Sequence, residues 1–334
     1  MEVSGRLGNF RVEVEQKPQH ISPQKCIACG ICVEVCPTTP KAIQSPPPEA
    51  VPYSYSIDES QCLRLKGKRC NRCREICPTN AIAFEQKPKR QELNNVGAII
   101  VATGFDVFNA REIGCLNYSR YPNVLTGLDL ERIFRNQGSL KLPSNGGKPK
   151  KVAFIQCVGS RDENHGYCSQ VCCKYAIRLA RLITYQTPDA EVTIFYIDLQ
   201  TAGKGFAQFY QECQESIRFI RGVPIEILEA PSDELEVRFE NISQGRVERE
   251  NFDLVALSVG IAPRKDSWDL AKVLGINLGD DGFFDTKEPF NSVETNVEGI
   301  FLAGACQGSK DIPDSIAHGI SAAERAMEVL QRCK

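Results

Sequence analysis

Cysteines are the residues whose number and spacing point most directly to chemistry in this sequence. Of the 16 cysteines, 12 fall into three groups, and two of the groups have the spacing of iron–sulfur ligands. The first group is an uninterrupted C-x₂-C-x₂-C-x₃-C-P run that consists of Cys26, Cys29, Cys32 and Cys36. Because iron–sulfur clusters carry electrons, the first expectation is a protein of electron transfer.

The second group repeats this run with a longer first spacing, and it consists of Cys62, Cys70, Cys73 and Cys77. In bacterial ferredoxins the fourth cysteine of a run ligates the other cluster. Crossed ligation then predicts one [4Fe–4S] cluster on Cys26, Cys29, Cys32 and Cys77, and a second on Cys62, Cys70, Cys73 and Cys36. Paired C-x₂-C motifs also suit structural zinc, but zinc needs neither the third cysteine nor the trailing Cys-Pro of each run.

The third group matches no ferredoxin run, and it consists of Cys157, Cys168, Cys172 and Cys173. Cys157 would end a buried strand, and the other three would open a helix, so the four thiols could converge on one metal centre. The positive end of a helix would favour a cluster that carries four thiolates. A pair of redox-active thiols, or simply buried cysteines, would explain the same spacing.

Composition excludes several classes of function. The chain has 334 residues with 42% hydrophobic content and a formal net charge of −2, so no basic face for nucleic acid is indicated. The sequence contains neither an apolar run of eighteen residues nor a signal peptide, so we expect no transmembrane segment. This many thiols without a secretory context indicate metal sites in a cytoplasmic protein rather than disulfides.

The elements that must position these residues alternate between strands and helices from residue 96 onward. Continuous apolar runs predict strands over 96–104, 151–156, 191–198, 252–260 and 299–304. Amphipathic patterns predict helices over 168–185, 206–217 and 315–333, and residues 224–243 resemble a hairpin. This alternation is typical of an α/β layered fold.

Two of the predicted strands end in glycine and suggest a cofactor site. Thr103-Gly104 ends one strand, and Gly304 ends another before a loop and helix that contain Asp311, Ile312 and Ser315. Glycine lets a ligand approach the backbone closely, and ligands of such sheets lie at the carboxyl ends of the strands. Taken together and in this order, these segments resemble the two later flavin-contacting segments of a flavoprotein with two dinucleotide-binding domains, and this resemblance implies contacts to FAD. The sequence has no G-x-G-x-x-G motif, so the FAD diphosphate would need a partner chain that carries one.

At this point the sequence strongly resembles the A subunit of heterodisulfide reductase. The resemblance rests on QKCIACGICVEVCP, VGAIIVATGFDVF, KKVAFIQCVGSRDE with YCSQVCCKYAI, and GIFLAGACQGSKDIPDSIA. It implies a thioredoxin-reductase-like flavoprotein with two dinucleotide-binding domains, an inserted two-cluster ferredoxin module and a third [4Fe–4S] cluster on Cys157, Cys168, Cys172 and Cys173. It also implies other heterodisulfide-reductase-like subunits, hydrogenase or formate dehydrogenase modules as partners, and electron bifurcation at the flavin.

One departure from the family shapes the predicted domains, because the N-terminal FAD-binding half is absent. We expect an N-terminal segment of the truncated flavin domain over 1–19 and the ferredoxin module over 20–88. A partial FAD-binding domain is expected over 89–148 and 262–334, and a nicotinamide-type α/β domain with the third cluster over 149–261.

The leading hypothesis is an electron-transfer subunit of a heterodisulfide-reductase-like complex, with three [4Fe–4S] clusters and a flavin shared with a partner chain. No catalytic acid, base or nucleophile is predicted. One alternative is a self-contained NAD(P)H-linked flavin and iron–sulfur oxidoreductase. The missing glycine-rich motif argues against it, because Cys157 stands where a phosphate loop would be. Another alternative is a scaffold subunit that transfers no electrons.

Overall fold

The computed structural model describes the whole chain except residues 1, 47–49, 201–202, 289 and 333–334. It divides into two compact units, one of residues 1–5 and 9–96 and the other of residues 6–8 and 97–334. No helix among the described residues is both long enough and apolar enough to cross a membrane.

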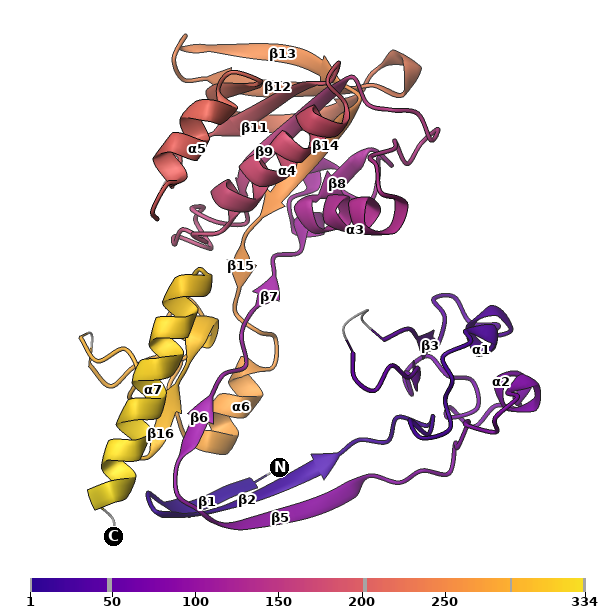
Figure 1. Ribbon diagram of the computed structural model, residues 1–334, viewed down its shortest axis with the longest axis vertical. Coiled ribbons are helices and arrows are strands. Elements are labelled where there is room, and N and C mark those ends of the chain that lie inside the picture. Colours follow the sequence, from indigo (N-terminus) through magenta and orange to yellow (C-terminus); the bar gives the residue numbers. More distant parts are fainter. Residues whose placement is uncertain (1, 47–49, 201–202, 289, 333–334) are drawn as a thin grey trace. The chain divides into compact units, whose positions relative to one another are not determined.

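The first unit consists of a small sheet and an inserted cysteine-rich module. The sheet has the strand order β1-β2-β5, with β1 at Glu2–Arg6, β2 at Asn9–Gln16 and β5 at Lys89–Val96 (Figure 1). Strands β2 and β5 are antiparallel, and Gln16 at the end of β2 pairs with Lys89 at the start of β5. The chain therefore leaves and re-enters the sheet at neighbouring positions, which lets the residues between them fold as an insertion.

The inserted module has little regular structure, and its elements are α1 (Ile31–Glu34), β3 (Ile43–Gln44), β4 (Ser56–Ile57) and α2 (Arg72–Ile76). Its core is formed by apolar residues together with three of the ferredoxin-type cysteines, namely Ile21, Cys36, Ala42, Ile43, Ile57, Cys62, Cys73, Ala81, Ile82 and Phe84. Thiols thus take a large share of a core that contains few large apolar side chains.

The second unit is built around a seven-stranded sheet with the order β13-β12-β11-β10-β9-β14-β8. The strands are β8 (Val124–Thr126), β9 (Lys151–Val158), β10 (Glu191–Tyr196), β11 (Ile217–Glu229), β12 (Leu235–Asn241), β13 (Arg246–Phe252) and β14 (Leu254–Val259). Neighbours from β8 to β11 are parallel, whereas β12 is antiparallel to both β11 and β13. The predicted hairpin is therefore confirmed.

Both faces of the central strands are buried, as the continuous apolar runs predicted. On β9, Val152 and Phe154 pack into one cluster with residues of α4 (Cys172–Gln186), while Ala153 and Ile155 belong to a second cluster. This alternation follows from the two-residue period of a strand. The other helices of this layer are α3 (Gly127–Gln137) and α5 (Phe206–Cys213).

A smaller layer contains the parallel pair β6 (Ile99–Val101) and β16 (Ile300–Leu302), with α7 (Ile312–Arg332) beside it (Figure 1). It is linked to the large sheet through the antiparallel pair β7 (Asp106–Val107) and β15 (Ile261–Ala262), and α6 (Ser267–Leu274) follows β15. Short 3₁₀ turns occur at Ala110–Glu112, Gly114–Leu116, Pro231–Asp233 and Gly304–Cys306.

The predicted elements are present, with shifted boundaries. Helix α4 begins at Cys172 rather than Cys168, because residues 168–171 form a loop in which Gln170 has a φ of 62°. Helix α5 ends at Cys213, since β11 already begins at Ile217. The sequence analysis did not anticipate β8, which lies within the range 89–148 and pairs with β14 of the large sheet.

Candidate functional site

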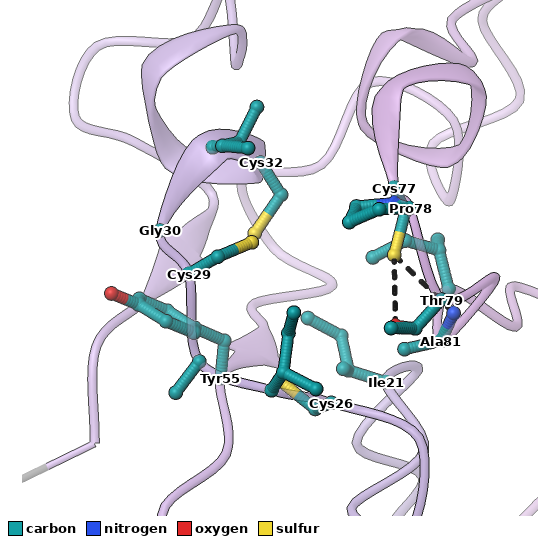
Figure 2. A pocket seen from close by; sticks show the side chains of 14 residues that line it. Ile21, Cys26, Cys29, Gly30, Cys32, Tyr55, Cys77, Pro78, Thr79 and Ala81 are labelled. Carbon is teal, nitrogen blue, oxygen red and sulfur yellow. Dashed lines mark hydrogen bonds between the residues drawn. The ribbon is translucent and has the colours of Figure 1, made fainter.

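Four cysteines from both ferredoxin-type runs line one hollow of the first unit. Figure 2 shows Cys26, Cys29 and Cys32 of the first run together with Cys77 of the second. The hollow encloses about 340 Å³ of empty space, and its other lining residues are mostly apolar: Ile21, Ile27, Ile31, Tyr55, Ala81 and Ile82. The fold thus places the last cysteine of the second run beside the first three cysteines of the first run.

The local backbone explains how a short segment can present three thiols to one hollow. Ala28 has a φ of 55° and Gly30 a φ of 78°, so the chain turns sharply twice between Cys26 and the start of α1. Residues with a side chain rarely adopt this left-handed backbone conformation, whereas glycine adopts it without steric cost. Cys77 is brought in by the end of α2, where the helix stops before Pro78.

A second hollow gathers the remaining four ligand candidates, Cys36, Cys62, Cys70 and Cys73. Its empty volume, which is open to solvent, is about 340 Å³, as in the first hollow. The longer spacing after Cys62 forms a compact turn, in which the Lys66 N–H donates to the Cys62 carbonyl at 3.0 Å and Gly67 has a φ of 79°. The insertion thus leaves Cys62 and Cys70 at the same hollow.

In each of the two Cys-Pro-Thr segments, the threonine hydroxyl lies close to the cysteine sulfur. Thr38 Oγ1 lies 3.3 Å from Cys36 Sγ, and Thr79 Oγ1 lies 3.7 Å from Cys77 Sγ, which also accepts the Ala81 N–H at 3.3 Å. Although burial raises the pKa of both thiols, these hydroxyl and backbone donors lower the pKa of Cys36 and of Cys77 below the usual value. Donors that favour the thiolate suit a ligand to a cation.

One thiol in each hollow, that of Cys32 or Cys73, has a pKa above the usual value instead. Burial, followed by the charges of Cys26 and Cys29, raises the pKa of Cys32, and burial with Cys62 and Cys70 raises the pKa of Cys73 to about 12. Four thiolates repel one another in a weakly hydrated hollow unless positive charge joins them. Among the described residues, no three His, Cys, Asp or Glu side chains are grouped so as to hold a single metal ion.

The third cysteine group lies in the second unit, where β9 ends and α4 begins. The Cys157 thiol is hydrogen-bonded to Cys172, which lowers the pKa of Cys157 and raises the pKa of Cys172 to about 12. Cys173 is hydrogen-bonded to Cys172, and the charge of Cys168 acts on both Cys157 and Cys172. The fold therefore brings all four predicted residues together.

The loop between Cys157 and Cys168 is closed by its own hydrogen bonds. The Ser160 hydroxyl donates to the Tyr167 carbonyl at 2.8 Å, and the Arg161 N–H donates to the same carbonyl at 3.1 Å. Cys157 itself has a φ of 60°, an uncommon value for a residue with a side chain. This turn directs the end of β9 toward the start of α4, which explains how residues fifteen apart meet.

The two glycine-ended strands also meet as predicted. Val101 pairs with Leu302, so Thr103 and Gly304 lie beside each other at the carboxyl ends of β6 and β16. Gly104 and Gly304 have φ values of 73° and 72°, and a methyl group added to Gly104 would meet nothing within 4 Å. A methyl group at Gly304 would lie 3.9 Å from Ser315 Cβ. The bare backbone at these turns leaves room for a flat ligand to approach.

Two other predicted cofactor residues have different surroundings. The Asp311 carboxylate accepts the Asp314 N–H at 3.0 Å at the start of α7 and pairs with Lys174 at 2.6 Å. The Ile312 side chain is 77% exposed. Sequence reasoning missed Lys174, because nothing in the local pattern connects it with Asp311, which lies 137 positions later.

His318 and Cys306 have structural partners beside this site. His318 accepts the Gly304 N–H on Nδ1 at 2.9 Å, and its Nε2 lies 2.6 Å from the Ser292 carbonyl. The buried Cys306 thiol donates to the Val101 carbonyl at 3.1 Å. Both residues therefore help to hold the ends of β6 and β16 in place.

Comparison with known proteins identifies relatives of this chain. A model described as "4Fe-4S binding domain" matches residues 20–39. The A subunit of the H(2):CoB-CoM heterodisulfide,ferredoxin reductase of Methanothermobacter thermautotrophicus is 44% identical over 97% of this chain and 51% of its own length. The iron-sulfur A subunit of the CoB–CoM heterodisulfide reductase of Methanocaldococcus jannaschii is 42% identical over 96% and 51%. This chain is homologous to the A subunit of heterodisulfide reductase.

The homology has a definite extent, since the chain spans about half the length of these two relatives. The relatives are named as subunits of oxidoreductases, and the predicted α/β fold with a ferredoxin module is confirmed by the sheets and by the matched iron–sulfur domain. Among solved structures, thioredoxin reductase of T. acidophilum has a TM-score of 0.46 and 15% identity, covering 91% of this chain and 88% of that one. Lactococcus lactis thioredoxin reductase has a TM-score of 0.45 and 21% identity, covering 75% and 70%.

Proposed function

We propose that the chain is an electron-transfer subunit of a heterodisulfide-reductase-like complex, with three [4Fe–4S] clusters and a flavin shared with a partner chain. The observation that carries the proposal is the exchange of the fourth cysteine between the two runs, Cys77 in one hollow and Cys36 in the other. A pair of independent zinc knuckles has no need of this exchange. Bound clusters would supply one-electron transfer.

The residues of the first unit would hold the clusters and shield them. Cys26, Cys29, Cys32 and Cys77 would ligate one cluster, and Cys36, Cys62, Cys70 and Cys73 the other. Apolar side chains surround the sulfurs, and the Thr38 and Thr79 hydroxyls stabilise negative charge on the crossed ligands. Hydrogen bonds to cluster sulfurs and solvent exposure are two of the main controls on reduction potential.

In the second unit, Cys157, Cys168, Cys172 and Cys173 would ligate the third cluster. The ion pair between Lys174 and Asp311 supports a route from this cluster to the flavin, because it joins the cysteine-bearing helix to the loop after Gly304. Thr103, Gly104, Gly304 and Ser315 would contact the flavin, and Asp311 and Ile312 would border it. The diphosphate would be bound by a glycine-rich loop of the partner chain, since this sequence contains no such motif.

The partner subunits, a hydrogenase or formate dehydrogenase module, bifurcation at the flavin and a cytoplasmic location belong to the same proposal. The partner modules have the support that two relatives are named as subunits of reductases that use H(2), or H(2) and formate, with heterodisulfide and ferredoxin. The alternative of a self-contained NAD(P)H-linked enzyme has less support, because β9 ends with Cys157 and Val158 and no glycine-rich phosphate motif follows it.

Anaerobic assays of iron, sulfide, zinc and FAD test this function. We expect about twelve irons per chain at full loading, four for each group of thiolates. Cys115→Ser is the matched control, because Cys115 is exposed and belongs to none of the three groups. About eight irons would eliminate the third cluster, and zinc in place of iron would eliminate the proposal. Stoichiometric FAD on the purified single chain would contradict the shared flavin.

A further inference from the structure

One amide side chain in the core of the second unit is buried without a hydrogen-bond partner. Gln156 of β9 is 7% exposed, and neither its amide nitrogen Nε2 nor its amide oxygen Oε1 has a partner. Among the described residues, Gln156 alone leaves two side-chain atoms in this state. A buried amide without hydrogen bonds costs free energy, so nearly all such groups in folded proteins have partners. Gln156 therefore indicates that a further group binds beside it.

The pattern of β9 shows which face of the large sheet Gln156 occupies. Phe154 packs with residues of α4, whereas Ile155 belongs to the cluster on the other face. Because the side chains of a strand alternate, Gln156 lies on the α4 face, one step beyond Phe154. Helix α4 begins with Cys172, which is hydrogen-bonded to Cys157 at the end of β9 (Figure 1). Gln156 therefore lies beneath the first turn of α4, where the third cysteine group gathers.

The neighbours of Gln156 on the two adjacent strands leave its amide nitrogen without an acceptor. The parallel register continues to Ser258 of β14 on one side and to Tyr196 of β10 on the other. Tyr196 is hydrogen-bonded to Tyr210. The Ser258 hydroxyl is fully buried and makes no hydrogen bond of suitable geometry, so it is a donor at hand for the Gln156 amide oxygen. The Gln156 Nε2 group then still needs an acceptor.

Tyr175, in the first turn of α4, ties this end of the sheet to the thiols. Its hydroxyl donates to the Val259 carbonyl at 2.9 Å, next to Ser258. Burial, followed by the charge of Cys172, raises the pKa of Tyr175, and the nearby Ser258 hydroxyl lowers it. Tyr175 thus lies close both to the end of β14 and to the cysteine group. The acceptors that the fold brings to the α4 face at the level of Gln156 are therefore sulfurs.

We infer that the Gln156 amide nitrogen donates a hydrogen bond to a sulfur of the third [4Fe–4S] cluster and thereby raises the reduction potential of that cluster. The inference rests on the proposed function, which assigns this cluster to Cys157, Cys168, Cys172 and Cys173. A primary amide has two N–H donors, and hydrogen bonds to the sulfurs are one of the main controls on cluster potential. Because reduction adds negative charge to the cluster, a donor favours the reduced form.

A buried water molecule is the competing partner for this amide, because such waters commonly join polar groups that lack other partners. The two partners predict different behaviour. If a water molecule satisfies the amide, the potential of the third cluster is independent of the amide hydrogens of Gln156. If a cluster sulfur satisfies it, removal of those hydrogens lowers the potential.

The first test is an EPR-monitored redox titration of the anaerobically purified holoprotein. The signal of the third cluster is identified by its loss in Cys157→Ser. Gln156→Met keeps the length of the side chain and removes both N–H donors, so it should lower the equilibrium constant for reduction of this cluster about tenfold, or about 59 mV for one electron. Its iron content should stay at about twelve per chain.

Asn123→Leu is the matched control, because Asn123 is a buried amide of the same unit whose partner is known. It is 2% exposed, its Nδ2 donates to Ser144 Oγ at 3.1 Å, and its Oδ1 accepts the Ser144 N–H at 3.1 Å. Asn123→Leu should lower the urea midpoint of unfolding and leave the potential of the third cluster unchanged. A general loss of core packing would instead move the potential in both variants, and that result would overturn the inference.

A second test detects the hydrogen bond in the wild-type protein. With glutamine labelled by ¹⁵N in the side chain only, pulsed EPR of the reduced third cluster should show a ¹⁵N hyperfine coupling. Gln170→Met should keep this coupling, because Gln170 is exposed although it lies near Cys168. Twelve irons with no coupling, or a wild-type potential in Gln156→Met, would overturn the inference in favour of a water molecule. About eight irons in the wild type would contradict the proposed function as well.

Discussion

Lys174 Nζ lies 2.6 Å from Asp311 Oδ2, and this ion pair joins the helix of Cys172 and Cys173 to the helix that follows Gly304. The two carboxylate oxygens of Asp311 have different hydrogen-bond partners. Oδ2 accepts from the ammonium group, and Oδ1 accepts the Asp314 N–H at the start of α7. Both side chains are less than one third exposed, so the pair is better shielded than an ordinary surface salt bridge.

Two substitutions of Asp311 should separate the contribution of the ion pair from that of the helix cap. Asp311→Asn keeps an acceptor for the helix cap and removes the charge, so it should cost about 1 kcal/mol of unfolding free energy. Asp311→Ala removes the cap as well and should cost about 1 kcal/mol more. Urea unfolding under anaerobic conditions measures both. Equal losses in the two variants would show that the cap contributes nothing beyond the ion pair.

The crossed arrangement of the two hollows predicts a reciprocal result. Cys36→Ser should damage the cluster of Cys62, Cys70 and Cys73, and Cys77→Ser should damage the cluster of the first run, because each hollow takes its fourth thiol from the other run. EPR of the reduced protein distinguishes the two clusters by their signals. Loss of the same signal in both variants, or loss of the first-run signal in Cys36→Ser, would contradict crossed ligation.

The ferredoxin-type sites could be predicted because their information is local. Spacings of two and three residues, with a proline after the last thiol, fix which cysteines can reach one hollow. The two glycine-ended strands were also predictable, since each is a continuous apolar run that stops at a glycine. In each case the sequence contains a short pattern whose geometry is nearly determined by covalent structure.

Other features of the fold and of the site depend on which helices and strands become neighbours in space. No short sequence pattern predicts those contacts. Lys174 and Asp311 lie far apart in sequence, and neither has a distinctive local context. Strand β8 has three residues, and only its pairing with β14 identifies it as part of the large sheet. The buried face of α7 was unpredictable for a different reason, because the sequence analysis predicted the helix but not which of its apolar residues its own sheet would bury.

The capping box at the start of α3 predicts a pH dependence. Asp129 Oδ2 accepts from the Thr126 N–H and hydroxyl at 3.0 and 2.7 Å and from the Tyr118 hydroxyl at 2.9 Å. Although burial raises the pKa of Asp129, these donors hold it below the usual value. The stability it supplies is therefore present above the unfolded pKa of about 3.9 and lost as pH falls through the lower folded value.

Asp129→Asn should accordingly cost about 1 kcal/mol at neutral pH, a difference that stays constant from pH 8 to pH 5 and shrinks below about pH 4. Circular dichroism during urea unfolding at each pH measures it, with Asp189→Asn as the control because Asp189 is exposed beyond the end of α4. A difference that grew toward low pH would mean that the carboxyl is protonated in the folded chain.

Gly159 and Gly166 offer a matched test of the third cysteine group, because both lie in the segment between β9 and α4. Gly159 has a φ of 70°, and a methyl group there would lie 2.1 Å from the ring of the buried Phe108. A methyl group on Gly166 would meet nothing within 4 Å.

Gly159→Ala should therefore cost about 2 to 5 kcal/mol through backbone strain and overpacking. Since Gly159 is two positions from Cys157, it should also move the end of β9 and lower the iron content from about twelve to about eight per chain. Gly166→Ala should change neither quantity. Full iron loading and wild-type stability in Gly159→Ala would show that the turn after Cys157 does not set the geometry of the site.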